Sequence, residues 1–70
     1  MLRPIKDYKK HVVCYADDDT GIIECKYKRQ TTVTIVPVGG IFSIVRENTK
    51  TDIERISITA FNVRSYPAVI

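Results

Sequence analysis

The sequence has a single histidine, His11, and only two cysteines, Cys14 and Cys25. These three side chains are too few for a closed tetrahedral zinc site. A lone histidine at a strand start is usually a surface residue, and no serine has a recognisable nucleophile context. No glycine-rich phosphate loop follows a strand. These absences argue against an enzyme and against a bound metal or other cofactor, so we expect a protein that works by binding.

Long apolar runs are also missing, because the longest one, IVPVGGIF, is far shorter than a membrane-spanning helix. The charged N-terminal stretch MLRPIKDYKK has no apolar run behind it, which is unlike a secretory signal. We therefore expect no membrane association and a cytoplasmic location. In such a reducing compartment the two cysteines are expected to be free thiols.

With 70 residues, of which 44% are hydrophobic, the chain is expected to form one small β domain over residues 1–70. Eleven Lys and Arg against eight Asp and Glu give a net charge of +3. This mildly basic balance is compatible with nucleic acid or with an acidic protein surface.

Short runs rich in Val, Ile, Thr, Tyr and Phe alternate with turn residues, which predicts an all-β fold. The pattern predicts five strands, over residues 10–16, 22–28, 32–38, 41–47 and 53–63. Such strands fit a small antiparallel meander or barrel of the SH3-like, Sm-like or OB type. Pro4 suits the first turn of a short N-terminal helix through about residue 10.

The pair Gly39-Gly40 is a natural two-residue hairpin turn, because both glycines accept positive φ. This turn would place Ile35 opposite Ile44. A following loop at 48–52 would then place Ile44 opposite Ile56, and Arg46 opposite Glu54. One sheet face would collect a predicted core of Val33, Ile35, Phe42, Ile44, Ile56, Ile58 and Ala60.

The other face of these strands carries Val36, Val38 and Ile41 near the Gly-Gly tip. An uncovered apolar patch of this kind often marks an interface. It suggests a protein-interaction module, such as a small inhibitor or regulatory subunit, that uses this patch or a free strand edge. A homodimer is one form of such an interaction.

The stretch CYADDDTGIIEC contains Tyr15-Ala16-Asp17-Asp18, which resembles the metal-binding turn of reverse transcriptases. The resemblance covers four residues, whereas two-metal chemistry also requires a further carboxylate and a shaped cavity. Adjacent acids in a strand-like segment point to opposite sides and do not converge on one calcium ion. The aspartates are therefore interpreted as turn formers.

Two registers are open for this hairpin. A two-residue loop at Asp19-Thr20 places Cys14 opposite Cys25, where a bridge is geometrically possible. A three-residue loop through Gly21 places the cysteines on opposite faces. Turn chemistry favours the three-residue loop, because Gly21 suits the left-handed residue of a bulge.

The basic stretch ECKYKR is the best functional lead. Its cations, with those before the second strand, predict a patch made of Lys9, Lys10, Lys26, Lys28 and Arg29. Such a surface can hold a phosphate backbone, with tyrosines available to stack on bases. The first functional hypothesis is therefore binding of RNA or single-stranded DNA, and the protein-interaction module is the alternative.

Overall fold

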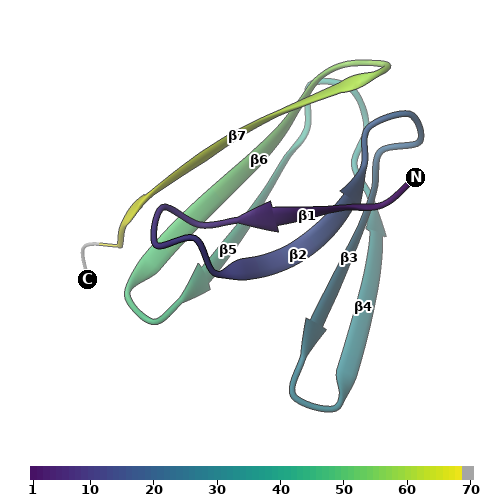
Figure 1. Cartoon of the computed structure of the whole chain (residues 1–70). Coiled ribbons are helices and arrows are strands. Elements are labelled where there is room, and N and C mark those ends of the chain that lie inside the picture. Colours follow the sequence, from purple (N-terminus) through teal and green to yellow (C-terminus); the bar gives the residue numbers. More distant parts are fainter. Residues whose placement is uncertain (69–70) are drawn as a thin grey trace.

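In the computed structural model, which describes residues 1–68, the chain is all-β, as predicted, and this part contains no helix. No helix in the described part is therefore long or apolar enough to cross a membrane. Residues 1–68 form seven strands rather than the predicted five, in two antiparallel sheets (Figure 1). The strands are β1 (Arg3–Lys6), β2 (Val12–Asp17), β3 (Ile22–Tyr27), β4 (Gln30–Ile35), β5 (Ile41–Arg46), β6 (Thr49–Ser57) and β7 (Ala60–Pro67).

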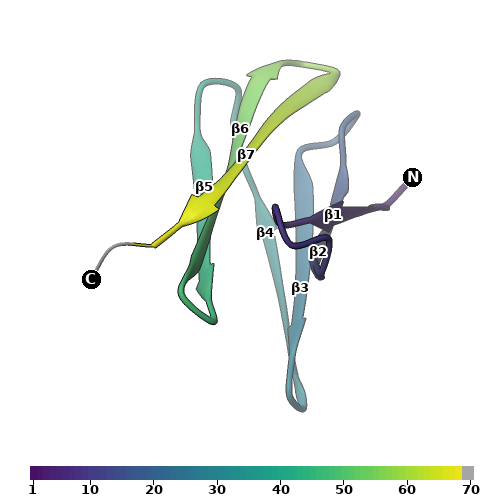
Figure 2. The same ribbon diagram turned by 60° about the vertical axis from the view of Figure 1, so that its left-hand side comes forward.

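The first sheet has the order β1-β2-β3-β4 and the second has the order β5-β6-β7. The two sheets lie side by side, and they do not close into a barrel (Figure 2). The predicted SH3-like, Sm-like or OB-type barrel is therefore not matched. Each sheet keeps two edge strands, β1 and β4 in the first and β5 and β7 in the second.

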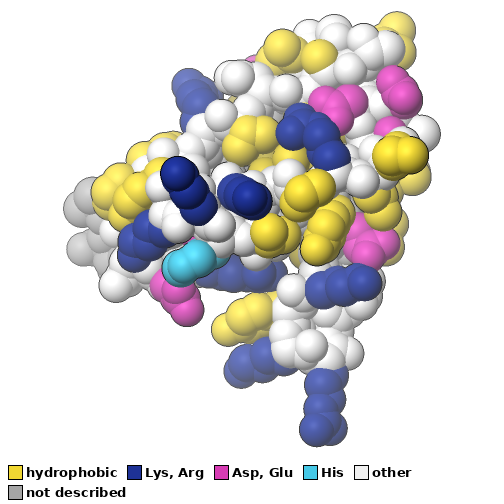
Figure 3. All heavy atoms as spheres, viewed as in Figure 1, with side chains coloured by type: hydrophobic (Ala, Val, Ile, Leu, Met, Phe, Trp, Pro, Cys, Tyr) yellow, Lys and Arg dark blue, Asp and Glu magenta, His cyan; other side chains and the backbone are white. Residues whose placement is uncertain are grey.

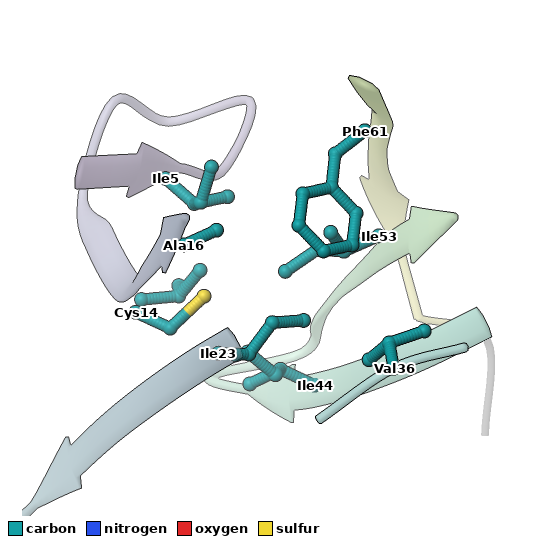
Figure 4. Packing of buried hydrophobic residues seen from close by; sticks show 9 residues of the cluster. Ile5, Cys14, Ala16, Ile23, Val36, Ile44, Ile53 and Phe61 are labelled. Carbon is teal, nitrogen blue, oxygen red and sulfur yellow. The ribbon is translucent and has the colours of Figure 1, made fainter. Parts of the chain in front are cut away.

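A small apolar core lies between the sheets (Figure 4). The first sheet contributes Ile5, Cys14, Ala16 and Ile23, which point toward Ile53 and Phe61 of the second sheet. A bulge at Ile5/Lys6 shifts the β1–β2 register, so that the consecutive residues Val13 and Cys14 are both buried. The cluster consists of Ile5, Val13, Cys14, Ala16, Ile23, Val36, Ile44, Ile53 and Phe61.

The predicted N-terminal helix is wrong, because Pro4 lies in the edge strand β1. An edge strand tolerates proline, which has no N–H to donate to a second neighbour. The next residues form a tight turn in which Asp7 Oδ1 accepts the His11 N–H at 2.9 Å. Lys10 closes this turn with a positive φ of 67°. The residues that were predicted to begin a helix therefore form a strand and the turn that follows it.

The prediction of a hairpin turn at Gly39-Gly40 is also wrong, because these glycines belong to a linker that passes from one sheet to the other. Ile35 pairs with Ile22 of β3, and Ile44 pairs with Thr51 of β6. The linker instead bonds to the second sheet, where Gly39 N–H donates to the Arg55 carbonyl at 2.7 Å.

The turn between β5 and β6 consists of Glu47 and Asn48, not of residues 48–52. Both have positive φ, 51° and 63°, as a two-residue hairpin of the preferred twist requires. Arg46 consequently pairs with Thr49, so the predicted Arg46–Glu54 pair is wrong. Ile44 pairs with Thr51 rather than with Ile56. This changes the register of β6 by an odd number of residues, and an odd shift moves the side chains of a strand to the opposite face.

The reversed face changes the predicted core. Thr49, Thr51, Ile53 and Arg55 of β6 are buried, whereas Ile56 is exposed. The predicted strand 53–63 is two strands, β6 and β7, joined by a turn that exposes Ile58. Of the predicted core, Ile44 is buried and Phe42 is partly buried, and Val33, Ile35, Ile56 and Ile58 are exposed.

A polar clasp, formed by Asp18 and Arg55, joins the two sheets at one end. Asp18 accepts two hydrogen bonds from Arg3 of the first sheet, at 2.6 and 3.1 Å, and one from the Phe61 N–H of the second, at 3.2 Å. The hydrogen bond from Arg3 is the main cause that lowers the pKa of Asp18 below its ordinary value.

Arg55 is 9% exposed and donates to three backbone carbonyls, those of Val36, Asp19 and Ile58, at 3.0, 3.4 and 2.8 Å. These carbonyls lie in three different connecting segments. The clasp therefore closes this end of the molecule, where the β2–β3 turn, the linker and the β6–β7 turn meet.

Candidate functional site

A cleft of about 780 Å³ opens at the end of the molecule opposite the clasp. The β2–β3 pairing covers only Tyr15↔Glu24, Ala16↔Ile23 and Asp17↔Ile22. Beyond these pairs β2 follows β1, whereas β3 continues with β4 into a projecting hairpin (Figure 1). The cleft occupies the space left by this divergence, with β5 as its other wall.

The cleft has an apolar interior and a polar mouth. Val13, Cys25, Phe42 and Ile44 line its inner part, and all four belong to the core cluster or pack against it. Three hairpin turns surround its mouth, and the turns and the strand ends beside them contribute these lining residues: Asp7, His11, Tyr27, Gln30, Arg46 and Glu47.

Tyr27 is the principal aromatic side chain at the mouth and is 57% exposed. The Arg46 guanidinium carbon lies 4.6 Å from the centre of its ring, and Lys28 Nζ lies 5.5 Å from it. Both distances are in the range of cation–π attraction. Tyr27 therefore connects the first sheet to Arg46 of the second, and its exposed ring has two cations beside it.

The structure distributes the predicted basic residues over several places. Lys9 and Lys10 lie in the β1–β2 turn, and Lys28 and Arg29 form the β3–β4 turn. Lys26 lies on the outer face of the first sheet, paired with Glu24 at 3.5 Å, and does not line the cleft. Figure 3 shows Lys and Arg side chains around the histidine, His11, and at the projecting hairpin, with a hollow between the two groups.

Acidic groups near the cleft are fewer than the cations. Asp7 and Glu47 line it, and Asp7 is buried with its carboxylate occupied by the His11 N–H. Five cations, Lys9, Lys10, Lys28, Arg29 and Arg46, lie on the turns or walls around it. The surroundings of the cleft therefore carry a positive local charge.

The three consecutive aspartates of the β2–β3 turn do not share one partner. Asp17 accepts the Asp19 N–H at 3.0 Å, while Asp18 belongs to the clasp. Within residues 1–68, no three His, Cys, Asp or Glu side chains gather where they could hold a metal ion. The aspartates are turn and clasp residues, as the turn interpretation predicts.

The same turn decides the cysteine register. Gly21 N–H donates to the Asp17 carbonyl at 2.9 Å and closes a loop of four residues, 18–21. The preferred three-residue loop is therefore wrong, and the pairing Ala16↔Ile23 is the one expected from the two-residue alternative. Cys14 and Cys25 consequently face the same way, and both are free thiols.

The predicted apolar interface is only partly exposed. Val36 is 4% exposed and belongs to the core, because its N–H bonds to the Gly21 carbonyl and turns its side chain inward. Val38 and Ile41 are more than half exposed. Val36 is therefore withdrawn from the predicted patch, and the exposed Ile56 of β6 lies close to the other two.

Sequence reasoning missed Arg46 and undervalued Tyr27 and His11, which all line the cleft. The signal for Arg46 was Asn48, a residue type favoured at positive φ, which marks a two-residue turn made of Glu47 and Asn48. That turn would have placed Arg46 at the end of a strand. Its contact with Tyr27 joins the two sheets and has no signal in the local sequence.

Comparison with known proteins gives no relative for this chain. No protein-family model, no curated protein sequence and no solved structure matches it.

Proposed function

We propose that the protein binds single-stranded nucleic acid, RNA or DNA, along the cleft. The observation that carries this proposal is the exposed ring of Tyr27 at the mouth of the cleft, between Arg46 and Lys28. Proteins that bind single strands combine a positive groove for the backbone with aromatic rings on which bases stack. The cations Lys9, Lys10, Lys28 and Arg29 on the neighbouring turns would contact phosphates.

A single strand suits the cleft better than a duplex. Unstacked bases expose their faces to an aromatic ring, whereas paired bases in a helix do not. The apolar interior beside Phe42 and Ile44 offers space for an inserted base. Lys26, on the outer face of the first sheet, would add to the general positive field without touching a strand in the cleft.

The double variant Lys28→Glu/Arg29→Glu should weaken binding to a fluorescent single-stranded oligonucleotide of mixed sequence. Each phosphate contact to a single strand contributes about −0.7 to the slope of log K against log salt. Loss of two contacts should therefore make the slope shallower by about 1.4. Fluorescence anisotropy titrations at several salt concentrations, with a DNA and an RNA probe, measure this slope.

A matched control is Lys50→Glu/Arg64→Glu, which changes the net charge equally. Lys50 and Arg64 lie on the outer face of the second sheet, away from the cleft. This control should leave the salt slope close to that of the wild type. Absence of binding to both probes at low salt, or an equal loss in the control variant, contradicts the proposed function.

A second candidate function is a protein-interaction module, such as a small inhibitor or regulatory subunit. It is favoured by Val38, Ile41 and Ile56, each more than half exposed. Hydrogen bonds of the linker to Arg55 bring these three side chains to one area of the second sheet. The unpaired edges of β4 and β5 offer a further contact by strand addition.

Self-association is the simplest form of this interaction and predicts a dimer mass in analytical ultracentrifugation. Val38→Asp should then restore the monomer, because it places a charge in the apolar contact. The exposed substitution Val45→Asp, on the same sheet but away from this area, should leave the dimer intact. A monomeric wild type at high concentration argues against self-association.

A further inference from the structure

Cys14 and Cys25 are the only cysteines of the chain, and the fold brings them together. The strand pairing ends at Tyr15↔Glu24, but the same register puts Cys14 opposite Cys25 one step beyond it, and the two thiols interact by a side-chain hydrogen bond. Both side chains turn toward the core, where Cys14 is 1% exposed and Cys25 is half-buried. Two thiols in neighbouring strands thus face each other.

The two thiols differ in their access to solvent. Cys25 lines the cleft, whereas Cys14 lies behind it in the core. The β2–β3 pairing ends at Tyr15↔Glu24, one step before the cysteines. A small reagent entering the cleft therefore meets Cys25 first.

The same arrangement makes the two thiols differ in how readily they lose a proton. Burial, and after it the interaction with Cys25, raise the pKa of Cys14 to about 12. Burial also raises the pKa of Cys25, but the hydrogen bond from the Cys14 thiol and the charge of Arg46 act in the opposite direction. Cys25 is therefore the first thiol to become a thiolate, which is the reactive form.

We propose that Cys14 and Cys25 form a reversible disulfide and that this bond regulates the cleft; the regulatory part rests on the proposed nucleic-acid function. The Cys25 thiolate attacks a small disulfide, forms a mixed disulfide and releases one thiol. Cys14 then loses its proton and attacks the Cys25 sulfur, which releases the second small thiol. The two protein thiols give up two electrons and two protons, and the small disulfide is reduced to two thiols.

The bond would change the cleft where β2 and β3 separate. A disulfide holds its two Cα atoms about 4.4–6.8 Å apart, so it extends the β2–β3 connection by one step. This draws Cys25 out of the cleft wall and brings Val13 and Tyr27 closer together. A narrower cleft should bind single-stranded nucleic acid severalfold more weakly.

The proposed Cys14–Cys25 bond is tested by intact mass. The protein is first incubated with glutathione disulfide, and the remaining thiols are then alkylated. In the wild type neither cysteine should be alkylated, no glutathione should remain attached, and the mass should be that of a monomer. Cys14→Ala should accumulate one glutathione adduct on Cys25, whereas Cys25→Ala should stay largely unmodified. The rate for Cys14→Ala should rise about tenfold per pH unit between pH 7 and 8, as the thiolate fraction rises.

Two fully alkylatable cysteines in the oxidant-treated wild type overturn the disulfide, as do equal adducts on both single variants. The wild-type mass needs no substitution, so the test does not depend on the folding of either variant. Anisotropy with the oxidised and reduced protein then tests the regulation, and equal affinities overturn it. If the reduced protein binds no oligonucleotide, the proposed function fails, while the mass result still decides the disulfide.

Discussion

Replacing Gly21 by alanine should destabilise the protein by about 3 kcal/mol or more, estimated as left-handed strain plus a lost charged hydrogen bond. Gly21 has a φ of 79°, in the left-handed region. A Cβ on this residue would lie 2.6 Å from the Val36 carbonyl oxygen and would also collide with the guanidinium of Arg55. The substitution therefore strains the turn and separates the Arg55–Val36 hydrogen bond.

Gly39 provides a matched control for this substitution. Its φ is 89°, but a Cβ there would meet no atom within 4 Å. Gly39→Ala should consequently show the strain alone, about 1–2 kcal/mol. Urea unfolding followed by circular dichroism gives both free energies. Equal losses in the two variants would contradict the crowding at Gly21.

Arg55→Met should also cost at least about 3 kcal/mol in the free energy of unfolding, because hydrogen bonds from a charged donor contribute about 1.5–3 kcal/mol each. Three carbonyls, those of Asp19, Val36 and Ile58, would lose their donor. Arg55→Lys should recover only part of this loss, because an ammonium group lacks the planar fork that spans three acceptors. The exposed Arg64→Met is the control and should change stability by less than 0.5 kcal/mol, roughly the range for surface substitutions.

The two substitutions should not be additive. In an Arg55→Met background the guanidinium that crowds Gly21 is absent, so Gly21→Ala should cost less than it does in the wild type. A double-mutant cycle in urea measures this coupling. Additive losses, or an Arg55→Met variant as stable as the wild type, would show that the clasp does not hold the three connecting segments together.

Local pattern was sufficient for the all-β class and for the approximate positions of two strands in the N-terminal half, but it predicted a helix where β1 lies. The β-branched and aromatic runs at 10–16 and 22–28 correspond to β2 and β3. In the second half the strand pairing was predicted wrongly, because the positions of the turns were predicted wrongly. Gly39-Gly40 has the sequence of a hairpin turn, yet the chain crosses here from one sheet to the other, and Val36 of this linker belongs to the core cluster.

The candidate site shows the same division. The predicted cations Lys9, Lys10, Lys28 and Arg29 lie in turns, where exposure of charge follows from composition. Their partners, Tyr27 and Arg46, are brought together only because β3 and β5 belong to different sheets that meet at the cleft. No spacing along the chain encodes that contact.

By itself, the sequence determined that this chain is built of short antiparallel strands, that its aspartates form a turn and that its predicted patch of lysines and Arg29 stays exposed. These properties depend on neighbouring residues, through strand propensity and turn chemistry. The tertiary structure alone decided which face of β6 is buried, whether Arg55 is a surface or a core residue, and whether Cys14 meets Cys25. Each of these depends on strand register, and one odd step in register moves every side chain of a strand to the opposite face.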